Sequence, residues 1–319
     1  VDYALMPNPG FTQGLDHRES MAYDAAGNLT GSTDAAGNTE TTAYDGAGRK
    51  TSFTNKAQST WTYAYNAAGQ LVQEISPQVM LADLPVGRLA SEMTQAMASV
   101  VTWMDYDALG HLTARTEAAG RSEQRTTRYE YDALGRQVKT IFPPVSVYQD
   151  EGANLLANGK SGAGTRTEQT VETSSETRYD TLGRAVAGRA AGSTAWSYKA
   201  YDRAGQLAWD VDALGYVTGY TRNAFGETER LVRYAQNITT RADGVLMRED
   251  EVRGAITARA GSTDRDILTG YDRLGRVKEV QEPYVFFWDS AAAEQGGGRK
   301  TTRNSYDALG NLTSVYTNT

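Results

Sequence analysis

Apolar and polar positions alternate with a period of two over short segments that are separated by glycine-containing turns. Trp61, Tyr63 and Tyr65 fall on one face of an extended segment whose intervening residues are small or polar, and Tyr129 and Tyr131 repeat the pattern. Alternation of this kind predicts half-buried β-strands. The aromatic face is expected to pack within the sheet; the alternative is a platform on which sugar rings stack.

A turn motif divides these segments at intervals of ten or eleven residues, which is one short strand plus one turn. Its consensus is Tyr-Asp-x-x-Gly-(Arg/Asn/Gln/His)-(Leu/Val)-Thr, and a version without the tyrosine lies between copies at 34–38, 117–121 and 212–218. The residues assigned to structural turns are Tyr23, Asp24, Gly27, Tyr44, Asp45, Gly48, Tyr65, Asn66, Gly69, Tyr106, Asp107, Gly110, Tyr131, Asp132, Gly135, Arg136, Tyr179, Asp180, Gly183, Arg184, Tyr201, Asp202, Gly205, Tyr271, Asp272, Gly275, Arg276, Tyr306, Asp307 and Gly310.

The chemistry of the motif explains its spacing. The aspartate side chain can accept a hydrogen bond from the N–H two residues on, and the glycine can take the left-handed conformation that closes a three-residue hairpin loop with a bulge. Asp132 is then expected to face Arg136, with exposed pairs of this kind contributing about 0.2–1 kcal/mol each. The tyrosine would lie opposite the Leu or Val that follows. The sequence therefore predicts an all-β chain that forms a continuous antiparallel sheet of hairpins.

The turn spacing breaks at 76–101, 142–176, 235–268 and 281–301, and we interpret 1–319 as one repeat region with these four insertions, a portion of a longer array or a polymerising unit. Residues 89–97 are expected to form a short amphipathic helix. The Gly/Ser/Thr-rich stretch 142–176 is expected to be a flexible loop. An extra hairpin is expected at Asp243-Gly244. The apolar run 284–288 is expected to fill a gap in a core, or else to bind a partner.

Composition and charge exclude several classes of function. The chain has no cysteine, and its two histidines, His17 and His111, lie far apart, so thiolate or histidine metal sites and nucleophilic triads are not expected. A net charge of −7 argues against nucleic-acid binding. No apolar run reaches the roughly 20 residues of a membrane span, and no glycine-rich phosphate loop precedes a helix. We expect no cofactor and no enzymatic activity; an enzyme would need acidic groups outside the turns, as at 248–251.

The recurring Tyr-Asp-Ala-Leu-Gly-Arg and Asp-Ala-Ala-Gly-Asn strings resemble the YD repeats of the Rhs (rearrangement hot spot) family. Relatives include the B and C components of bacterial insecticidal toxin complexes and the teneurins. Asp107 to Leu112, Asp132 to Arg136 and Asp307 to Leu312 follow the family turn closely. Departures are Lys50 in place of Leu or Val, Asn66 in place of Asp, and the copy at 223–226, which lacks its tyrosine.

This resemblance implies a β-sheet that spirals into a hollow shell, which in bacterial members encloses a variable C-terminal toxin released by an aspartyl autoprotease. Neither the DPxGL-type protease signature nor a non-repeat toxin domain is present in the sequence. The implied role is a wall segment of a bacterial polymorphic toxin that is secreted or displayed on the cell surface by a dedicated secretion system. Its partners would be the rest of the same Rhs-type polypeptide and the enclosed toxin domain.

Strand spacing limits what this segment can enclose. Roughly 20 to 25 strands at ~4.8 Å give a ribbon on the order of 100–120 Å, against roughly 140 Å needed around a toxin domain ~35 Å across. The alternative function is a surface-displayed repeat or fibre that serves adhesion or carbohydrate binding and self-associates through its sheet ends. It requires aromatic side chains such as Trp61 or Trp196 to be exposed to solvent in a row.

Overall fold

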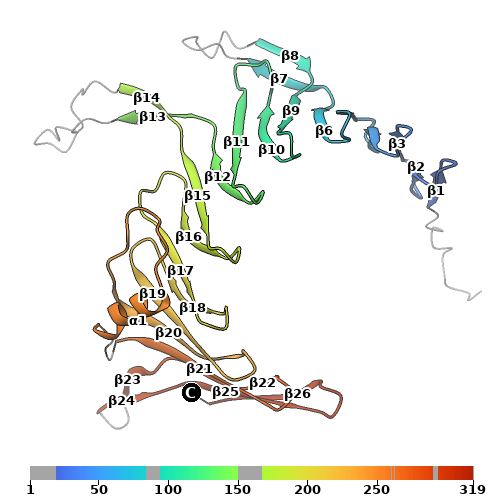
Figure 1. Ribbon diagram of the computed structural model, residues 1–319. Helices are drawn as coiled ribbons and strands as arrows, with labels where there is room; N and C mark the ends of the chain where they lie inside the picture. The colour runs from blue at the N-terminus through green and yellow to red at the C-terminus, as the bar shows by residue number, and fades with distance from the viewer. Residues whose placement is uncertain are drawn as a thin grey trace, which may run out of the picture. The chain divides into compact units, whose positions relative to one another are not determined.

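The computed structural model describes residues 19–83, 94–149, 167–259, 261, 263–289 and 294–318, and these are almost entirely β-structure (Figure 1). They contain 26 strands and one helix, and twenty of the strands carry the main antiparallel ladder. The all-β prediction is confirmed. The residues fall into two compact units, with unit 1 comprising Val1–Glu130 and Phe142–Glu172, and unit 2 comprising Tyr131–Ile141 and Thr173–Thr319.

Unit 1 is a meander in which each strand pairs antiparallel with the next member of the ladder. Its strands are β1 (Ser20–Tyr23), β2 (Leu29–Thr33), β3 (Thr39–Tyr44), β4 (Lys50–Thr54), β5 (Thr60–Tyr65), β6 (Leu71–Ile75), β9 (Val101–Tyr106), β10 (Leu112–Glu117) and β11 (Arg125–Tyr131). Two hairpins stand apart from this ladder, namely β7 (Val79–Asp83) with β8 (Thr94–Ala98), and β13 (Val145–Gln149) with β14 (Thr167–Val171).

Unit 2 continues the same construction with consecutive antiparallel pairing. Its strands are β12 (Gln137–Ile141), β15 (Ser174–Tyr179), β16 (Ala185–Arg189), β17 (Ser197–Tyr201), β18 (Leu207–Val211), β19 (Tyr216–Arg222), β20 (Thr228–Asn237), β21 (Arg265–Tyr271), β22 (Val277–Gln281), β25 (Thr301–Tyr306) and β26 (Leu312–Asn318). A separate hairpin joins β23 (Val285–Asp289) to β24 (Glu294–Gly298).

The four interruptions occupy equivalent places in the order of strands and turns along the chain. Each one follows a strand that begins just after a Tyr–Asp-type turn, namely β6, β12, β20 or β22, and the chain then re-enters the ladder at β9, β15, β21 or β25. Because neighbouring strands are antiparallel, the Tyr–Asp turns within a unit lie on the opposite edge of the sheet from its interruptions. Within each unit, the sheet edge that carries the Tyr–Asp turns therefore contains none of the four insertions.

The helix found among the described residues, α1 (Glu249–Thr257), covers a face of unit 2 (Figure 1). Its acidic first turn suits the positive end of the helix dipole, and Val252 and Ile256, one helical turn apart, are its buried residues. It contacts β17, β18 and β20. The resulting core consists of Ala187, Trp196, Tyr198, Ala200, Val211, Val217, Ile238, Met247, Val252 and Ile256.

Unit 1 has no comparable core among its described residues, where Thr116 is the one buried side chain. Side chains alternate instead between half-buried and exposed, as in β5, where Trp61, Tyr63 and Tyr65 are half-buried and Thr62 is exposed. The predicted alternation is confirmed there. Unit 1 is a single-layer sheet that is held mainly by its ladders and turns.

Four expectations about the interruptions are wrong where the structure describes them. Residues 94–97 of the expected helix 89–97 belong to β8, and 89–93 lie outside the described residues. The stretch 142–176 contains β13 and β14 rather than only a loop, and 150–166 lie outside the described residues. No strand flanks Asp243-Gly244, and α1 follows instead. In the apolar run 284–288, Tyr284, Val285 and Phe286 are 51%, 55% and 69% exposed and fill no core gap, and the side chains of 287 and 288 lie outside those that the structure describes.

Candidate functional site: the latched Tyr–Asp turns

The Tyr–Asp turns share one hydrogen-bonding pattern, which the first copy illustrates. Asp24 Oδ1 accepts the N–H groups of Ala26 at 2.9 Å and Asn28 at 2.8 Å, and Gly27 N–H donates to the Asp24 carbonyl at 3.1 Å. Gly27 has φ of +86°, where a side chain would be strained. Positive φ recurs at the predicted glycines Gly48, Gly69, Gly110, Gly135, Gly183, Gly205, Gly275 and Gly310.

The predicted cross-strand pairs form at these turns. Tyr23 lies opposite Leu29, Tyr106 opposite Leu112 and Tyr271 opposite Val277, each beside a bulge. Leu or Val is not required at this position, since Tyr44 and Tyr179 lie opposite Lys50 and Ala185. The Asp-x-x-Gly loop therefore sets the register.

Arginine after the glycine pairs with the aspartate of its own turn, as predicted. Nε donates to Oδ2 at 2.7 Å in Arg49–Asp45, Arg136–Asp132, Arg184–Asp180 and Arg276–Asp272. Each guanidinium also extends to the following Tyr–Asp turn, an interaction that the sequence did not predict. It lies over the next tyrosine ring, with centroid distances of 4.9 Å at Tyr65, 4.6 Å at Tyr179, 4.4 Å at Tyr201 and 4.5 Å at Tyr306.

The tyrosine hydroxyl completes the link by donating back to the preceding hairpin. Its acceptor is the carbonyl of the first residue in the return strand of that hairpin. Seven tyrosines do so at 2.8–3.3 Å: Tyr44 to Leu29, Tyr65 to Lys50, Tyr106 to Leu71, Tyr179 to Gln137, Tyr201 to Ala185, Tyr271 to Thr228 and Tyr306 to Val277. We call this tyrosine–carbonyl hydrogen bond, together with the arginine over the ring at Tyr65, Tyr179, Tyr201 and Tyr306, a latch. It ties consecutive hairpins through side chains in addition to the sheet ladder.

Copies that depart from the consensus keep the turn with other polar groups. Asn66 Oδ1 accepts Gln70 N–H at 2.9 Å, and the Gln70 side-chain amide donates to the Gly110 carbonyl of the next Tyr–Asp turn at 3.0 Å. Asn223 forms the same loop without a tyrosine. His111 occupies the arginine position, with Nδ1 2.9 Å from Asp107 Oδ2.

Several turn carboxylates are held in their charged form. The side-chain amide of Asn28 lowers the pKa of Asp24, the Arg136 guanidinium lowers that of Asp132, and the backbone N–H of Arg276 lowers that of Asp272. In a turn without tyrosine, a hydrogen bond from the Lys56 ammonium lowers the pKa of Asp34 to about 2. Because donors satisfy the carboxylates, these groups are turn formers rather than poised acids or bases.

The segment 248–251 contains the acidic groups outside the turns that were considered as candidates for catalysis. The contacts of Glu249 and Glu251 stabilise the local structure around α1. Glu251 accepts the Arg248 N–H at 2.9 Å and pairs with Arg241 at 2.9 Å, and Glu249 pairs with Arg253. Within the described residues no group of three or more metal-ligating side chains occurs. No helix in that part of the chain is long and apolar enough to cross a membrane. The absence of catalytic activity stays a prediction.

Trp61 and Trp196, the two tryptophans named for an exposed row that would bind carbohydrate by stacking, are not exposed side by side. Trp196 is 3% exposed and belongs to the core of unit 2. Trp61 is half-buried and packs against Phe53 of the neighbouring strand, with ring centroids 5.9 Å apart. The interpretation of the aromatic face as sheet packing is therefore confirmed at Trp61.

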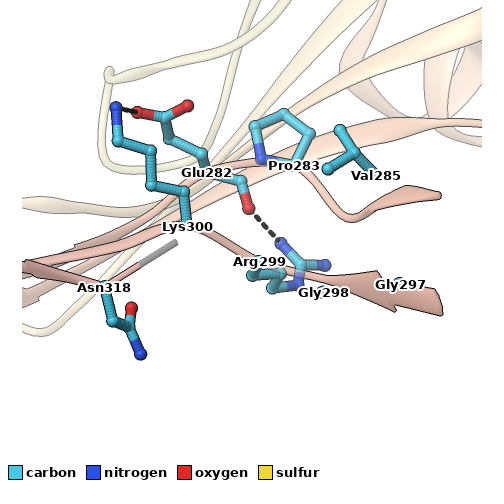
Figure 2. Close-up of a pocket in the computed structure, with 8 residues that line it drawn as sticks. All are labelled: Glu282, Pro283, Val285, Gly297, Gly298, Arg299, Lys300 and Asn318. Atoms are coloured by element: carbon cyan, nitrogen blue, oxygen red, sulfur yellow. Dashed lines mark hydrogen bonds and ion pairs between the residues drawn. The ribbon is translucent and has the colours of Figure 1, made fainter. Parts of the chain in front are cut away.

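A separate hollow lies in unit 2 where the β23–β24 hairpin leaves the sheet (Figure 2). Its volume is about 610 Å³. Arg299 donates to the Glu282 carbonyl at 3.2 Å and also pairs with Asp266, while Lys300 Nζ lies 3.4 Å from a Glu282 carboxylate oxygen. The lining residues are Glu282, Pro283, Val285, Gly297, Gly298, Arg299, Lys300 and Asn318.

The sequence identified the residues of each turn but not the latch between turns. One sequence pattern could have indicated the latch: a copy with arginine after its glycine is followed by a copy that begins with tyrosine, as with Arg184 and Tyr201 or Arg276 and Tyr306. Such a pair shares a face only when the two hairpins are neighbours in the sheet, which depends on strand order.

Comparison with solved structures gives matches of low identity. A structure described as TcdB2-TccC3-Cdc42 is 14% identical, with a TM-score of 0.44, over 94% of this chain and 16% of that one. TcdB2-TccC3 without its hypervariable C-terminal region is 14% identical, with a TM-score of 0.46, over 95% and 15%. The Photorhabdus luminescens Tc holotoxin pore is 12% identical, with a TM-score of 0.36, over 94% and 17%. The chain thus spans about one sixth of the length of these structures.

No curated protein matches the sequence. The family model of the RHS repeat matches residues 23–60 and 106–143. The first match contains the turns at Asp24, Asp34, Asp45 and Asn55, and the second contains those at Asp107 and Asp132. The chain therefore contains RHS repeats, as its Tyr–Asp motifs predict.

Proposed function

We propose that this chain is a structural wall segment of an Rhs-type toxin shell. The observation that carries the proposal is the series of latches. A tyrosine hydroxyl ties one hairpin to the hairpin before it, as Tyr65 donates to Lys50, and in four copies an arginine lies over the ring, as Arg49 lies over Tyr65. These contacts stabilise a sheet without a second layer, which an ordinary β-domain uses to bury its apolar face. Unit 1, whose described residues include one buried side chain, is such a sheet.

The enclosed cargo is part of the same proposal. A single-layer wall has two faces, one of which can line a compartment while the other meets solvent. We infer a C-terminal toxin as cargo, the remaining Rhs-type polypeptide as the rest of the wall, and delivery from a bacterial cell to the outside. The RHS-repeat matches and the latches support this role, and the packing of Trp61 and Trp196 within the protein disfavours the adhesion alternative.

Limited proteolysis of the complete gene product that contains residues 1–319 tests the proposal. A segment that follows the repeats should resist trypsin while the sheet is folded, and should be degraded after the same sample is unfolded in urea. The double variant Arg184→Ala/Tyr201→Phe, which removes one latch, should shorten the protection, whereas Arg203→Ala, at an exposed turn position, should not. Equal cleavage rates before and after unfolding, or no segment beyond the repeats, would refute enclosure.

A further inference from the structure

A groove crosses one face of unit 2, away from the latches. It consists of two adjoining hollows with volumes of about 740 Å³ and about 430 Å³. Arg230, Val232 and Tyr234 line both hollows, and as alternate residues of β20 they lie on the same face of the sheet. Hollows of this size are typical of sites for small molecules.

The floor of the groove is a row of residues that lie opposite one another on four neighbouring strands. Trp209 lies opposite Gly219, Gly219 opposite Val232, and Val232 opposite Asp266. A Cβ on Gly219 would lie 2.6 Å from Trp209 Cζ3, so the indole ring occupies the space above this glycine. The ring centroid of Tyr234 lies 6.1 Å from that of the indole. Aromatic rings therefore form one end of the row and a carboxylate forms the other.

The larger hollow contains a charge network that is balanced within itself. Asp266 Oδ2 accepts a hydrogen bond from Arg230 Nε at 3.1 Å, and Arg299 pairs with Asp266 Oδ1. Burial acts to raise the pKa of Asp266, but hydrogen bonds from Arg299 and Arg230 outweigh burial and lower the pKa, so this carboxylate is charged. Asp264 accepts two backbone N–H groups at 2.9 Å each. Two basic and two acidic side chains thus line this hollow, which carries no net charge.

An exposed pair of aromatic rings lines the same hollow where the β23–β24 hairpin begins. Tyr284 precedes β23 and Phe286 lies within it, and their ring centroids are 5.2 Å apart with the ring planes at 73°. The two side chains are 51% and 69% exposed. The hollow therefore presents apolar ring surfaces beside a polar network, which suits a molecule that has both apolar and polar faces.

We propose that this groove is a binding site for a neutral oligosaccharide. A pyranose ring has apolar C–H faces that can stack on Tyr284 and Phe286, and its hydroxyl groups both donate and accept hydrogen bonds. The Arg230 side chain is 52% exposed and would donate to these hydroxyls, while Asp264 would accept from them. The smaller hollow, beside Trp209, would hold a further sugar of the same chain.

The position of the groove favours a sugar over an extended peptide. Peptides that add to a sheet need an edge with free backbone groups. The groove instead lies on the face of strands β18 to β21, each of which is paired on both sides. A neutral ligand is also expected, because the balanced charges of the larger hollow offer no net attraction to an ion. The site needs no row of aromatic side chains along the repeats.

Isothermal titration of the full chain with chitohexaose and with cellohexaose, two neutral β-linked hexasaccharides, tests this inference. At least one of them should bind saturably with one-to-one stoichiometry. Phe286→Ala should weaken that binding about tenfold, because it removes an apolar surface on which the sugar stacks. Phe225→Ala is the matched control, since Phe225 is 90% exposed at a turn outside the groove, and it should leave binding unchanged.

A second pair of variants tests the polar part of the groove. Arg230→Ala should weaken binding about tenfold, because it removes a charged hydrogen-bond donor while Asp266 keeps Arg299 as its partner. Arg233→Ala, on the opposite face of β20, should leave binding unchanged. Hydrogen exchange of β20 and β21 in the Phe286→Ala chain should match the unchanged protein, which excludes misfolding as the cause.

Three results would each overturn the proposal: no saturable binding of either hexasaccharide, equal effects of the two phenylalanine variants, or equal effects of the two arginine variants. The groove is separate from the latches, so its failure would leave the wall proposal standing.

Discussion

Removing one latch arginine is expected to loosen the sheet locally. Arg184 is the best position because its Nε lies 2.7 Å from Asp180 Oδ2 and its guanidinium lies 4.4 Å from the Tyr201 ring centroid. Its side chain is 29% exposed and that of Asp180 is 11% exposed. Arg184→Ala removes both interactions while the turn backbone, which depends on Asp180 and Gly183, is kept.

The expected cost follows from the two contacts. An ion pair at the protein surface contributes about 0.2–1 kcal/mol, and a cation–π contact at the surface contributes about 0.5–1 kcal/mol. The sum is about 1–2 kcal/mol, which corresponds to a roughly 5- to 30-fold change in a local opening equilibrium. Because repeat sheets open in parts rather than as one unit, the effect should stay near the two hairpins.

Hydrogen exchange read by mass spectrometry is the suitable assay. Peptides that cover β15 to β18 should exchange roughly 5- to 30-fold faster in Arg184→Ala, while peptides from β25 and β26 should not change. Arg203→Ala removes the same charge from an exposed position of the next turn and should have no effect. A double-mutant cycle with Tyr201→Leu should show a coupling of about 0.5–1 kcal/mol. Equal effects of the two arginine variants, or zero coupling, would refute the latch.

Three further predictions concern the turns and the core. Gly215→Ala should lower the thermal midpoint more than Gly37→Ala, because a Cβ at Gly215 would lie 2.2 Å from the Ile238 carbonyl, whereas Gly37 lies in open space at a similar φ; equal shifts would contradict this. Ile256→Ala should cost about 2–5 kcal/mol in urea unfolding followed by tryptophan fluorescence; an unchanged midpoint would show that α1 is not docked. Stabilisation by Asp34, whose folded pKa is about 2, should be complete above its unfolded pKa and disappear as the pH falls from about 4 to about 2. Thermal midpoints should therefore stay level from about pH 7 to 5, and Asp34→Asn should reduce the loss below about pH 4.

The turns were predictable because their chemistry is local. Five consecutive residues contain the donors, the acceptor and the left-handed glycine, so Asp180, Gly183 and Arg184 could be assigned to a turn without knowledge of the rest of the chain. The latches were not predictable in the same way. The Tyr201 hydroxyl reaches Ala185, 16 residues away, and the Tyr271 hydroxyl reaches Thr228, 43 residues away across an interruption.

The four interruptions show most clearly where prediction from the sequence fails. The expected helix at 89–97 included residues that became strand β8, because an edge pairing with β7 satisfies their backbone groups. The helix instead forms at Glu249–Thr257, where Val252 and Ile256 find an apolar face on unit 2 to cover. An amphipathic pattern indicates only that a helix would have an apolar face to bury. The tertiary fold determines whether an apolar surface is there to cover that face.

The amino-acid sequence by itself determined the regular spacing of the hairpin turns and the all-β class, since each turn closes through groups a few residues apart. The tertiary structure decided which hairpins latch together, where the core lies and where the hollow beside β26 forms. These features depend on groups that only strand order and register bring within contact distance.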